Sequence, residues 1–196
     1  MSIDQIRLQF AEHMETTAKA GELLPATIEA TGQAIVNCLL NGGKVLTCGI
    51  GASGSAAQCF ASMLVNRFET ERPSLPALAL NADATSMAAI ANDSAFIEVF
   101  AKPIRAFGNP EDVLIVISVD GNEPSIIQAV QAAHDREMQV CALTGSEGGE
   151  LINLYSPQDI ELRMPSSSLP RIQEHHSLVL HCLCDYIDQQ LFGGAQ

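Results

Sequence analysis

A glycine-rich loop, Gly49-Ile50-Gly51-Ala52-Ser53-Gly54, follows a short apolar segment and matches the pattern G-x-G-x-x-G. Backbone N–H groups in such a loop, with the start of the next helix, can hold a phosphate group. A dinucleotide site would also need an acid after the next strand, and Asp83 lies farther along than that pattern expects. The alternatives are a phosphate or sugar-phosphate loop with Ser53 and Ser55 as hydroxyl donors, and a tight turn that needs glycine for its shape alone.

A second polar loop, residues 118–123, follows the most apolar segment of the chain. Ser118 and Asn122 can donate hydrogen bonds to a ligand. Asp120 and Glu123 would repel an anion, because like charges that lie close together raise the free energy of binding. An alternative is that both carboxylates turn outward, with Glu123 favourable near the positive end of a helix.

A regular alternation of apolar segments and helical patterns must position these loops. Five segments are typical of strands: 44–48, 76–80, 112–118, 140–144 and 159–164, the last being polar enough for a sheet edge. The helical patterns cover 55–68, 85–90, 95–107, 124–136 and 170–192. This alternation predicts an α/β fold with a parallel sheet covered on both faces, and ligands in such folds bind at the carboxyl ends of the strands. The loops at those ends are 48–55, 81–85, 118–124, 144–149 and 165–171.

Two more helices, expected over 3–20 and 25–41, precede the first strand. Their apolar residues recur every three or four positions and exceed what one buried face needs. We therefore expect a single domain over 1–196, with 1–42 as oligomerisation helices and 43–196 as the α/β core, which ends in a long helix.

The composition excludes several classes of protein. The net charge of −13 leaves little means of building the cationic face that a nucleic-acid protein needs, so we expect no direct nucleic-acid binding. No apolar run is long enough for a membrane span, and the first residues do not resemble a signal peptide. We expect a cytoplasmic protein with reduced cysteines, at positions 38, 48, 59, 141, 182 and 184.

Beyond these loops, short motifs along the whole chain resemble the sugar isomerase (SIS) domain family, in the branch that contains phosphoheptose isomerase and the DnaA initiator-associating protein DiaA. The motifs are Cys48-Gly49-x-Gly51-x-Ser53, Asn66-Arg67-Phe68-Glu69-x-Glu71-Arg72-Pro73, Ala91-Asn92-Asp93, Ala142-Leu143-Thr144-Gly145, Arg171-Ile172-Gln173-Glu174 and Cys182-Leu183-Cys184-Asp185. The resemblance implies a flavodoxin-like three-layer fold with a five-stranded parallel sheet, a homotetramer and a pocket between subunits. In the isomerase branch that pocket binds sedoheptulose 7-phosphate and zinc.

The chain departs from the isomerase pattern where the chemistry lies. Ile50 stands where the pattern has Asn, Cys59 where it has a zinc-binding His, and Met63 where it has the acid–base Glu. Isomerisation needs a group that takes and returns a proton, and a thioether cannot do so. Gln173 and His181 do match the remaining zinc positions. We expect no metal or other cofactor, and at Cys59 we favour an inert core cysteine. Zinc would be bound, by Cys59, Gln173 and His181, only if the chain were an active isomerase.

The phosphate loop of the family also changes here, because Val119, Asp120 and Glu123 replace three hydroxyl residues.

At the chain end, Leu191 and Phe192 precede a Gly-Gly pair and could anchor a partner protein, or pack on their own domain or on a neighbouring subunit. On the last helix His175 and His176 are adjacent, so we expect one of them exposed and the other in the pocket or in an interface.

We therefore predict a non-enzymatic homotetrameric scaffold that, by resemblance, binds the replication initiator DnaA and has no catalytic residue. Phosphoheptose isomerase, with His181 in its site, is the alternative, and a sensor of another sugar derivative is a weaker one. The predicted ligand-pocket residues are Ser53, Ser55, Asp83, Ser118, Asp120, Asn122, Glu123 and Gln173, and the predicted partner-binding residues are Leu191 and Phe192.

Overall fold

A computed structural model describes residues 2–145 and 147–193, and within them the chain forms one parallel sheet of five strands. The strands are β1 (Val45–Gly49), β2 (Ala77–Ala79), β3 (Val113–Ile117), β4 (Gln139–Thr144) and β5 (Ile160–Arg163). Their order in the sheet is β2-β1-β3-β4-β5, which is the flavodoxin-like order. The predicted fold class is thus confirmed, and β5 lies at a sheet edge as expected.

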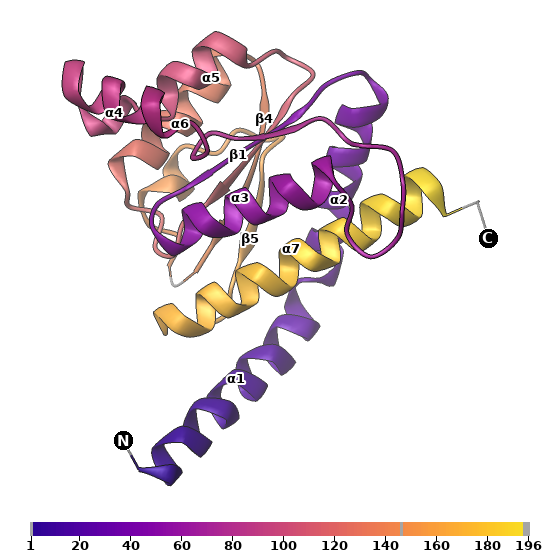
Figure 1. Ribbon diagram of the computed structural model, residues 1–196. Helices are drawn as coiled ribbons and strands as arrows, with labels where there is room; N and C mark the ends of the chain where they lie inside the picture. Colours follow the sequence, from indigo (N-terminus) through magenta and orange to yellow (C-terminus); the bar gives the residue numbers. More distant parts are fainter. Residues whose placement is uncertain (1, 146, 194–196) are drawn as a thin grey trace.

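Helices cover both faces of this sheet (Figure 1). The α-helices are α1 (Ile3–Leu23), α2 (Pro25–Leu40), α3 (Ala52–Val65), α4 (Ala84–Asp93), α5 (Ala101–Phe107), α6 (Pro124–Asp135) and α7 (Leu169–Phe192), and the 3-10 helices are η1 (Phe96–Glu98) and η2 (Gly149–Asn153). On one face α2, α3 and α7 bury their apolar sides. On the other face lie α5 and α6, with α4 packed against the same core.

The central strand β3 shows why the core has two layers. All five of its residues are buried. Ile115 and Ile117 pack with α3 and α7, whereas Leu114 and Val116 pack with α5 and α6, because successive side chains of a strand point to opposite faces. A strand buried on both faces needs a continuous apolar run, and 113–117 provides one.

Two helix predictions are corrected. Helix α3 begins at Ala52, three residues earlier than expected, because Gly51 has a φ of 59° and turns the chain directly from strand to helix. The continuous helix expected over 95–107 is wrong, because η1 and α5 are separate elements. Between them Val99 and Phe100 are fully buried, so the chain bends inward to place both side chains in the core.

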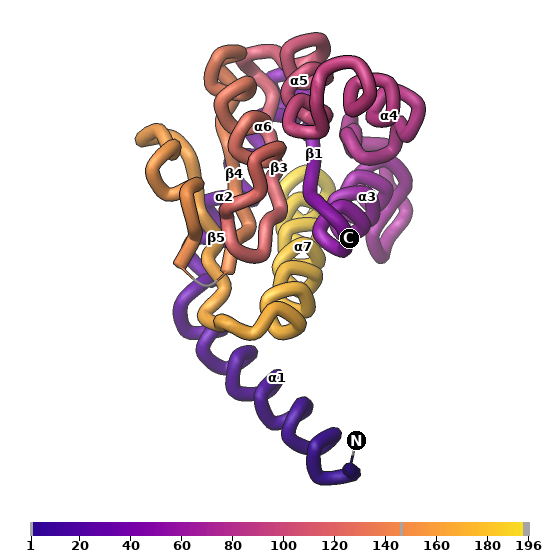
Figure 2. The backbone as a smooth tube through the Cα atoms, turned by 90° about the vertical axis from the view of Figure 1, so that its left-hand side faces the viewer, coloured from indigo at the N-terminus to yellow at the C-terminus, as the bar shows by residue number. Residues whose placement is uncertain are grey.

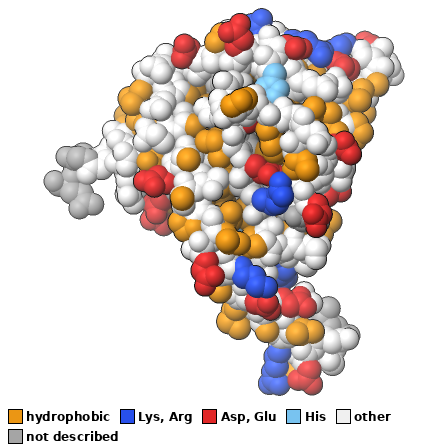
Figure 3. All heavy atoms as spheres, turned by 180° about the vertical axis from the view of Figure 1, so that it is seen from behind, with side chains coloured by type: hydrophobic (Ala, Val, Ile, Leu, Met, Phe, Trp, Pro, Cys, Tyr) orange, Lys and Arg blue, Asp and Glu red, His pale blue; other side chains and the backbone are white. Residues whose placement is uncertain are grey.

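Helix α1 projects from the body of the molecule, as Figures 1 and 2 show. Its buried residues are Thr16 and Ala20, both in its second half. The first half exposes large apolar side chains, and Figure 3 shows hydrophobic side chains on this arm next to charged ones. These exposed residues include Ile3, Ile6 and Phe10, and Met14, just past the middle of the helix, is exposed as well.

Among the described residues, no single helix is long and apolar enough to cross a membrane. Helices α1 and α2 satisfy the length and composition only as a pair, and they are bent by 66° with respect to each other.

Candidate functional site

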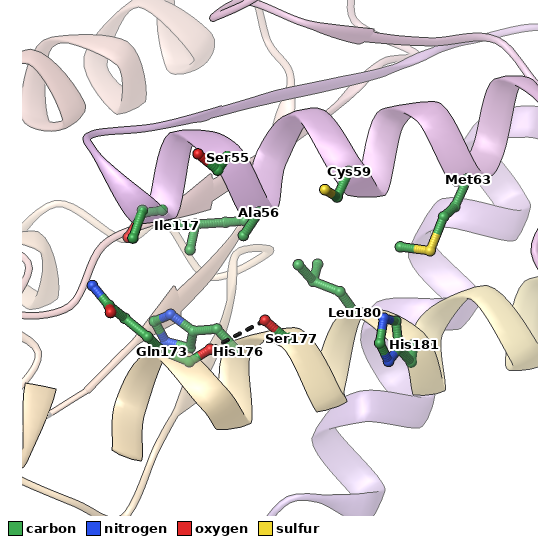
Figure 4. A pocket seen from close by; sticks show the side chains of 12 residues that line it. Ser55, Ala56, Cys59, Met63, Ile117, Gln173, His176, Ser177, Leu180 and His181 are labelled. Atoms are coloured by element: carbon green, nitrogen blue, oxygen red, sulfur yellow. Dashed lines mark hydrogen bonds between the residues drawn. The ribbon is translucent and has the colours of Figure 1, made fainter. Parts of the chain in front are cut away.

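A cavity of about 360 Å³ lies between α3 and α7, next to the carboxyl end of β3 (Figure 4). Ser53, Ser55, Cys59 and Met63 come to it from α3, and Gln173 and His181 come from α7, so the two helices bring together the residues that the sequence singled out on them. The full lining consists of Ala52, Ser53, Ser55, Ala56, Cys59, Met63, Ile117, Gln173, His176, Ser177, Leu180 and His181.

The α3 wall follows from helical spacing. Ser55, Cys59 and Met63 are four residues apart and share the face that looks toward α7 (Figure 4). Cys59 is exposed, which corrects the expectation of an inert core cysteine. A helix that carried a carboxylate at position 63 would aim it at His181 across the cavity, but here a thioether stands in that place.

Arg72 fixes the end of this wall. Its guanidinium donates to the carbonyl oxygens of Met63 (2.8 Å) and Leu64 (2.7 Å) at the last turn of α3. It also donates to Asp188 on α7, at 2.7 Å. Because the Arg72 side chain is 2% exposed and that of Asp188 is 12% exposed, this ion pair is shielded from water and holds the two walls of the cavity together.

The α7 wall contributes two histidines of different character. His181 is exposed and stacks at 5.5 Å on the ring of Phe68. His176 is buried, and its Nε2 lies 3.0 Å from the carbonyl oxygen of Thr144, which can only accept, so Nε2 carries the proton. Its Nδ1 has no hydrogen-bond partner among the residues that the structure describes, and burial lowers the pKa of His176 to about 4. His176 is therefore a neutral imidazole with a free lone pair beside the cavity.

The expectation that one of the two adjacent histidines is exposed is wrong, because His175 and His176 are each 1% exposed. Helix α1 accounts for the difference, since Thr17 of α1 contacts His175 and covers the side of α7 that would otherwise face water. The sequence placed one of the two histidines in the pocket or in an interface without choosing between them, and His176 is the one that lines the cavity. Its position three residues after Gln173, on the same helix face, was the signal that could have found it.

The second polar loop lies outside the described lining of this cavity, and its polar groups bond to one another. Ser118 is fully buried, donates to Glu123 and accepts from the backbone of Gly121 at 2.7 Å. Asn122 receives the backbone N–H of Glu150 on its amide oxygen, at 3.1 Å. Glu123 is thus directed inward to Ser118, whereas Asp120 is exposed. The loop therefore carries two carboxylates, and its Ser118 hydroxyl is already hydrogen-bonded within the loop.

Asp83 is placed in another region. It caps α4 by accepting hydrogen bonds from the hydroxyl of Ser86 and from the backbone N–H of the same residue, the second at 3.0 Å, and these hydrogen bonds lower the pKa of Asp83. With Leu78 and Phe107 it lines a separate cavity of about 390 Å³. The structure therefore does not bring Asp83 together with the serines of α3.

As possible metal ligands, Cys59, Gln173 and His181 offer a thiol, an amide oxygen and an imidazole in the α3–α7 cavity. No carboxylate is present among the described residues of its lining.

Near the chain end, Leu191 and Phe192 are half-buried in the last turn of α7 and pack against the core on the α7 side of the sheet. Packing on their own domain, one of the alternatives, thus accounts for part of their surface.

Residues 9–145 match the SIS domain family. The chain belongs to that family. The matched residues include β1 to β4 of the sheet and α3, which forms one wall of the cavity.

Relatives with two different names match this SIS-domain chain almost equally well. The phosphoheptose isomerase of Chromohalobacter salexigens is 51% identical over 187 residues, which cover 95% of each chain. The DnaA initiator-associating protein DiaA of Citrobacter koseri is 50% identical over 190 residues, which cover 97% of each. Among solved structures, a phosphoheptose isomerase from Francisella tularensis superimposes with a TM-score of 0.94 at 48% identity, over 96% of this chain and 99% of the other.

Proposed function

We propose that this SIS-domain protein is a non-catalytic homotetramer that acts as a scaffold for the replication initiator DnaA. The observation that carries the proposal is Met63. It occupies the α3 wall opposite His181, where interconversion of an aldose and a ketose would need a group that accepts and returns a proton. Relatives named DiaA at 50% identity over almost the full chain support this reading.

The other titratable groups of the cavity do not replace the missing acid. His176 is a weak base, because burial holds its pKa at about 4 and its Nε2 is committed to Thr144. Cys59, Gln173 and His181 lack the carboxylate that would complete the family's zinc and proton-transfer set, so we propose that no catalytic zinc is used. The residues that remain can bind a small uncharged ligand, and His181, the exposed imidazole among them, has no carboxylate to act with in the described lining.

The polar loop after β3 supports the same conclusion. Glu123 accepts the hydrogen bond of the Ser118 hydroxyl, and the carboxylates of Glu123 and Asp120 carry charge of the same sign as a phosphate. A phosphate bound there would lose hydrogen bonds and meet like charge. The loop therefore disfavours the phosphorylated sugar on which the isomerase acts.

A scaffold needs several identical partner sites, and an assembly of four chains provides them. We propose that α1 and α2 join the subunits, since α1 exposes large apolar side chains such as Phe10, which is 68% exposed. Each chain would then present Leu191 and Phe192 to DnaA, and four linked sites bind a multi-copy partner far more tightly than one site. The acidic surface would speed the encounter with a basic partner surface.

Three measurements test the proposal. In the first, the purified protein is incubated with sedoheptulose 7-phosphate and added zinc, and we expect no product above background. Turnover that disappears in His181→Ala would overturn the non-catalytic reading. Light scattering on the same sample should give four chains per particle, and a monomer at micromolar concentration would refute the assembly.

The partner is tested by a DnaA pull-down with Leu191→Ala/Phe192→Ala. We expect the double variant to lose binding while its oligomeric state is unchanged. Phe107→Ala is the matched control, because Phe107 is also exposed, at 55%, but lies on α5. Equal binding by both variants would remove Leu191 and Phe192 from the interface, and absence of binding by the unmodified protein would refute the scaffold role.

Phosphoheptose isomerase is the second candidate. It is favoured by the presence of Gln173 and His181 in one cavity and by the 51% identity to a relative of that name. Under this alternative Cys59, Gln173 and His181 would hold zinc, which would polarise the sugar carbonyl. The turnover assay with His181→Ala separates the two candidates.

A further inference from the structure

Three side chains with metal-binding chemistry meet where α1 passes α7, away from the cavity described above. His13 of α1 and Glu174 and His175 of α7 each offer one possible ligand atom, and these atoms lie within 4.8 Å of one another. Nδ1 of His13 is 2.7 Å from Oε2 of Glu174, and the ring centroids of His13 and His175 are 5.0 Å apart. We propose that His13, Glu174 and His175 bind a divalent transition metal ion of the zinc class, which clamps α1 to α7.

The orientation of His175 suits a metal ligand. Its Nδ1 lies 2.7 Å from the carbonyl oxygen of Arg171 and donates to it, so Nε2 keeps its lone pair. Metal-binding histidines in proteins commonly have their second nitrogen held in this way. Nε2 lies 2.9 Å from the hydroxyl of Thr17, which also lies 2.8 Å from the carbonyl oxygen of His13. The one hydroxyl proton can serve only one of these acceptors, and a metal on Nε2 leaves it to the carbonyl.

The carboxylate is held in a similar manner. Oε1 of Glu174 accepts from Arg171 at 2.8 Å, which leaves Oε2 directed at His13. Hydrogen-bonded carboxylates of this kind are usual around metal ions. The Arg171 guanidinium weakens the site electrostatically, so we expect a moderate affinity rather than a permanently bound ion.

Access and ligand type define the class of ion. The side chains of His13 and Glu174 are 43% and 40% exposed and border an open cavity of about 350 Å³, which admits an ion from solvent. Two imidazoles and one carboxylate are the ligands preferred by zinc and its neighbours, whereas calcium and magnesium prefer oxygen alone. Three protein ligands leave a fourth position for water or for a side chain of another molecule.

The consequence concerns the projecting arm. Thr16 and Ala20 are the buried residues of α1, and nearer its free end the helix is joined to α7 by the hydrogen bond that Arg171 donates to the carbonyl oxygen of Gln9. His13 lies one turn nearer the free end than Thr17. A metal ion bound there adds a link between the contacts of Gln9 and Thr17 with α7, and so stiffens the direction in which the apolar residues before it project. This inference does not depend on the proposed scaffold role.

The test is a titration of the full-length, metal-stripped protein with Co²⁺, followed by visible absorption and calorimetry. We expect one ion per chain, with a spectrum of nitrogen and oxygen ligands and no thiolate charge-transfer band. His13→Gln and Glu174→Gln should each weaken binding by about tenfold or more. His134→Gln is the matched control, because His134 also pairs with a carboxylate at 2.7 Å, that of Asp159, but lies on α6.

A second titration separates this site from the α3–α7 cavity. The double variant Cys59→Ser/His181→Gln should leave the Co²⁺ affinity unchanged. Loss of binding in that variant would show that the metal binds in the α3–α7 cavity and would overturn the proposal. Amide hydrogen exchange supplies an independent measure, since Zn²⁺ should slow exchange in α1 of the unmodified protein and not of His13→Gln. The proposal is also refuted if no ion binds, or if His13→Gln binds Co²⁺ as tightly as the control.

Discussion

The carboxylate of Glu123 gives the sharpest prediction about ligand choice. Glu123→Gln keeps the size of the side chain and an oxygen that can accept from Ser118, and it removes one negative charge from the loop after β3. A unit charge 4 Å from a phosphate costs about 1 kcal/mol in water and about 4 kcal/mol at an effective dielectric constant of 20. Because Glu123 is partly buried, the substitution should tighten binding of sedoheptulose 7-phosphate by about fivefold to a thousandfold.

The assay is calorimetric titration of sedoheptulose 7-phosphate into the unmodified protein and each variant, at low salt and at about 0.15 M salt. Asp120→Asn should give a smaller gain, because Asp120 is exposed. Glu111→Gln is the matched control, since it removes the same charge just before the opposite end of β3. At the higher salt the Debye length is about 8 Å, so a contact effect persists while the effect of a distant charge disappears.

The reasoning fails if Glu123→Gln binds the sugar phosphate no more tightly than Glu111→Gln. That result would mean that the carboxylate does not face a bound phosphate. It would also remove the loop as support for the non-catalytic reading, whose structural support would then come from the α3–α7 cavity, above all from Met63.

The remaining predictions concern the stability of the site, measured by urea unfolding. Arg72→Ala should cost about 3–5 kcal/mol, because it leaves Asp188 without its shielded partner; a cost below 1 kcal/mol would show that the pair is dispensable. Gly121→Ala should cost about 2–4 kcal/mol, because Gly121 has a φ of 73° and a Cβ there would lie 2.0 Å from the carbonyl oxygen of Gly148; an unchanged midpoint would contradict this geometry. The pKa of His176 is about 4 in the folded chain, against an ordinary value of 6.5, so the unfolded chain binds the extra proton between these values. Stability should therefore fall by about 3 kcal/mol as the pH drops from 6.5 to 4, and His176→Gln should lose less over that range.

The sequence was sufficient for the fold because its strongest signals are local. The apolar run of 113–117 can be satisfied only by a strand buried on both faces, and the helical patterns on either side of it supply the covering layers. The break at Val99 and Phe100 could not be predicted, since a bend that buries two side chains depends on the core that receives them. The early start of α3 depends on one backbone angle, at Gly51, which G-x-G permits but does not require.

For the site, helical spacing was enough to place residues on a common face but not to choose between faces. Cys59 and Met63 are four residues apart on α3, and Gln173 and His181 are eight apart on α7, so each pair was expected to share a side of its helix. The burial of His175 could not be foreseen, because it depends on where α1 passes α7. Such contacts between distant segments leave no periodic signal in the chain.

The arm formed by α1 has a consequence for how the purified protein should behave on dilution. The part of α1 that stands away from the body gains little from the core, and isolated helical segments shorter than about 12–15 residues are marginal in water. If other chains cover Ile3, Phe10 and Met14, the free energy that orders the arm comes from association and obeys mass action. Far-ultraviolet circular dichroism should then lose helical signal from about the first twelve residues at low protein concentration, before the α/β core unfolds.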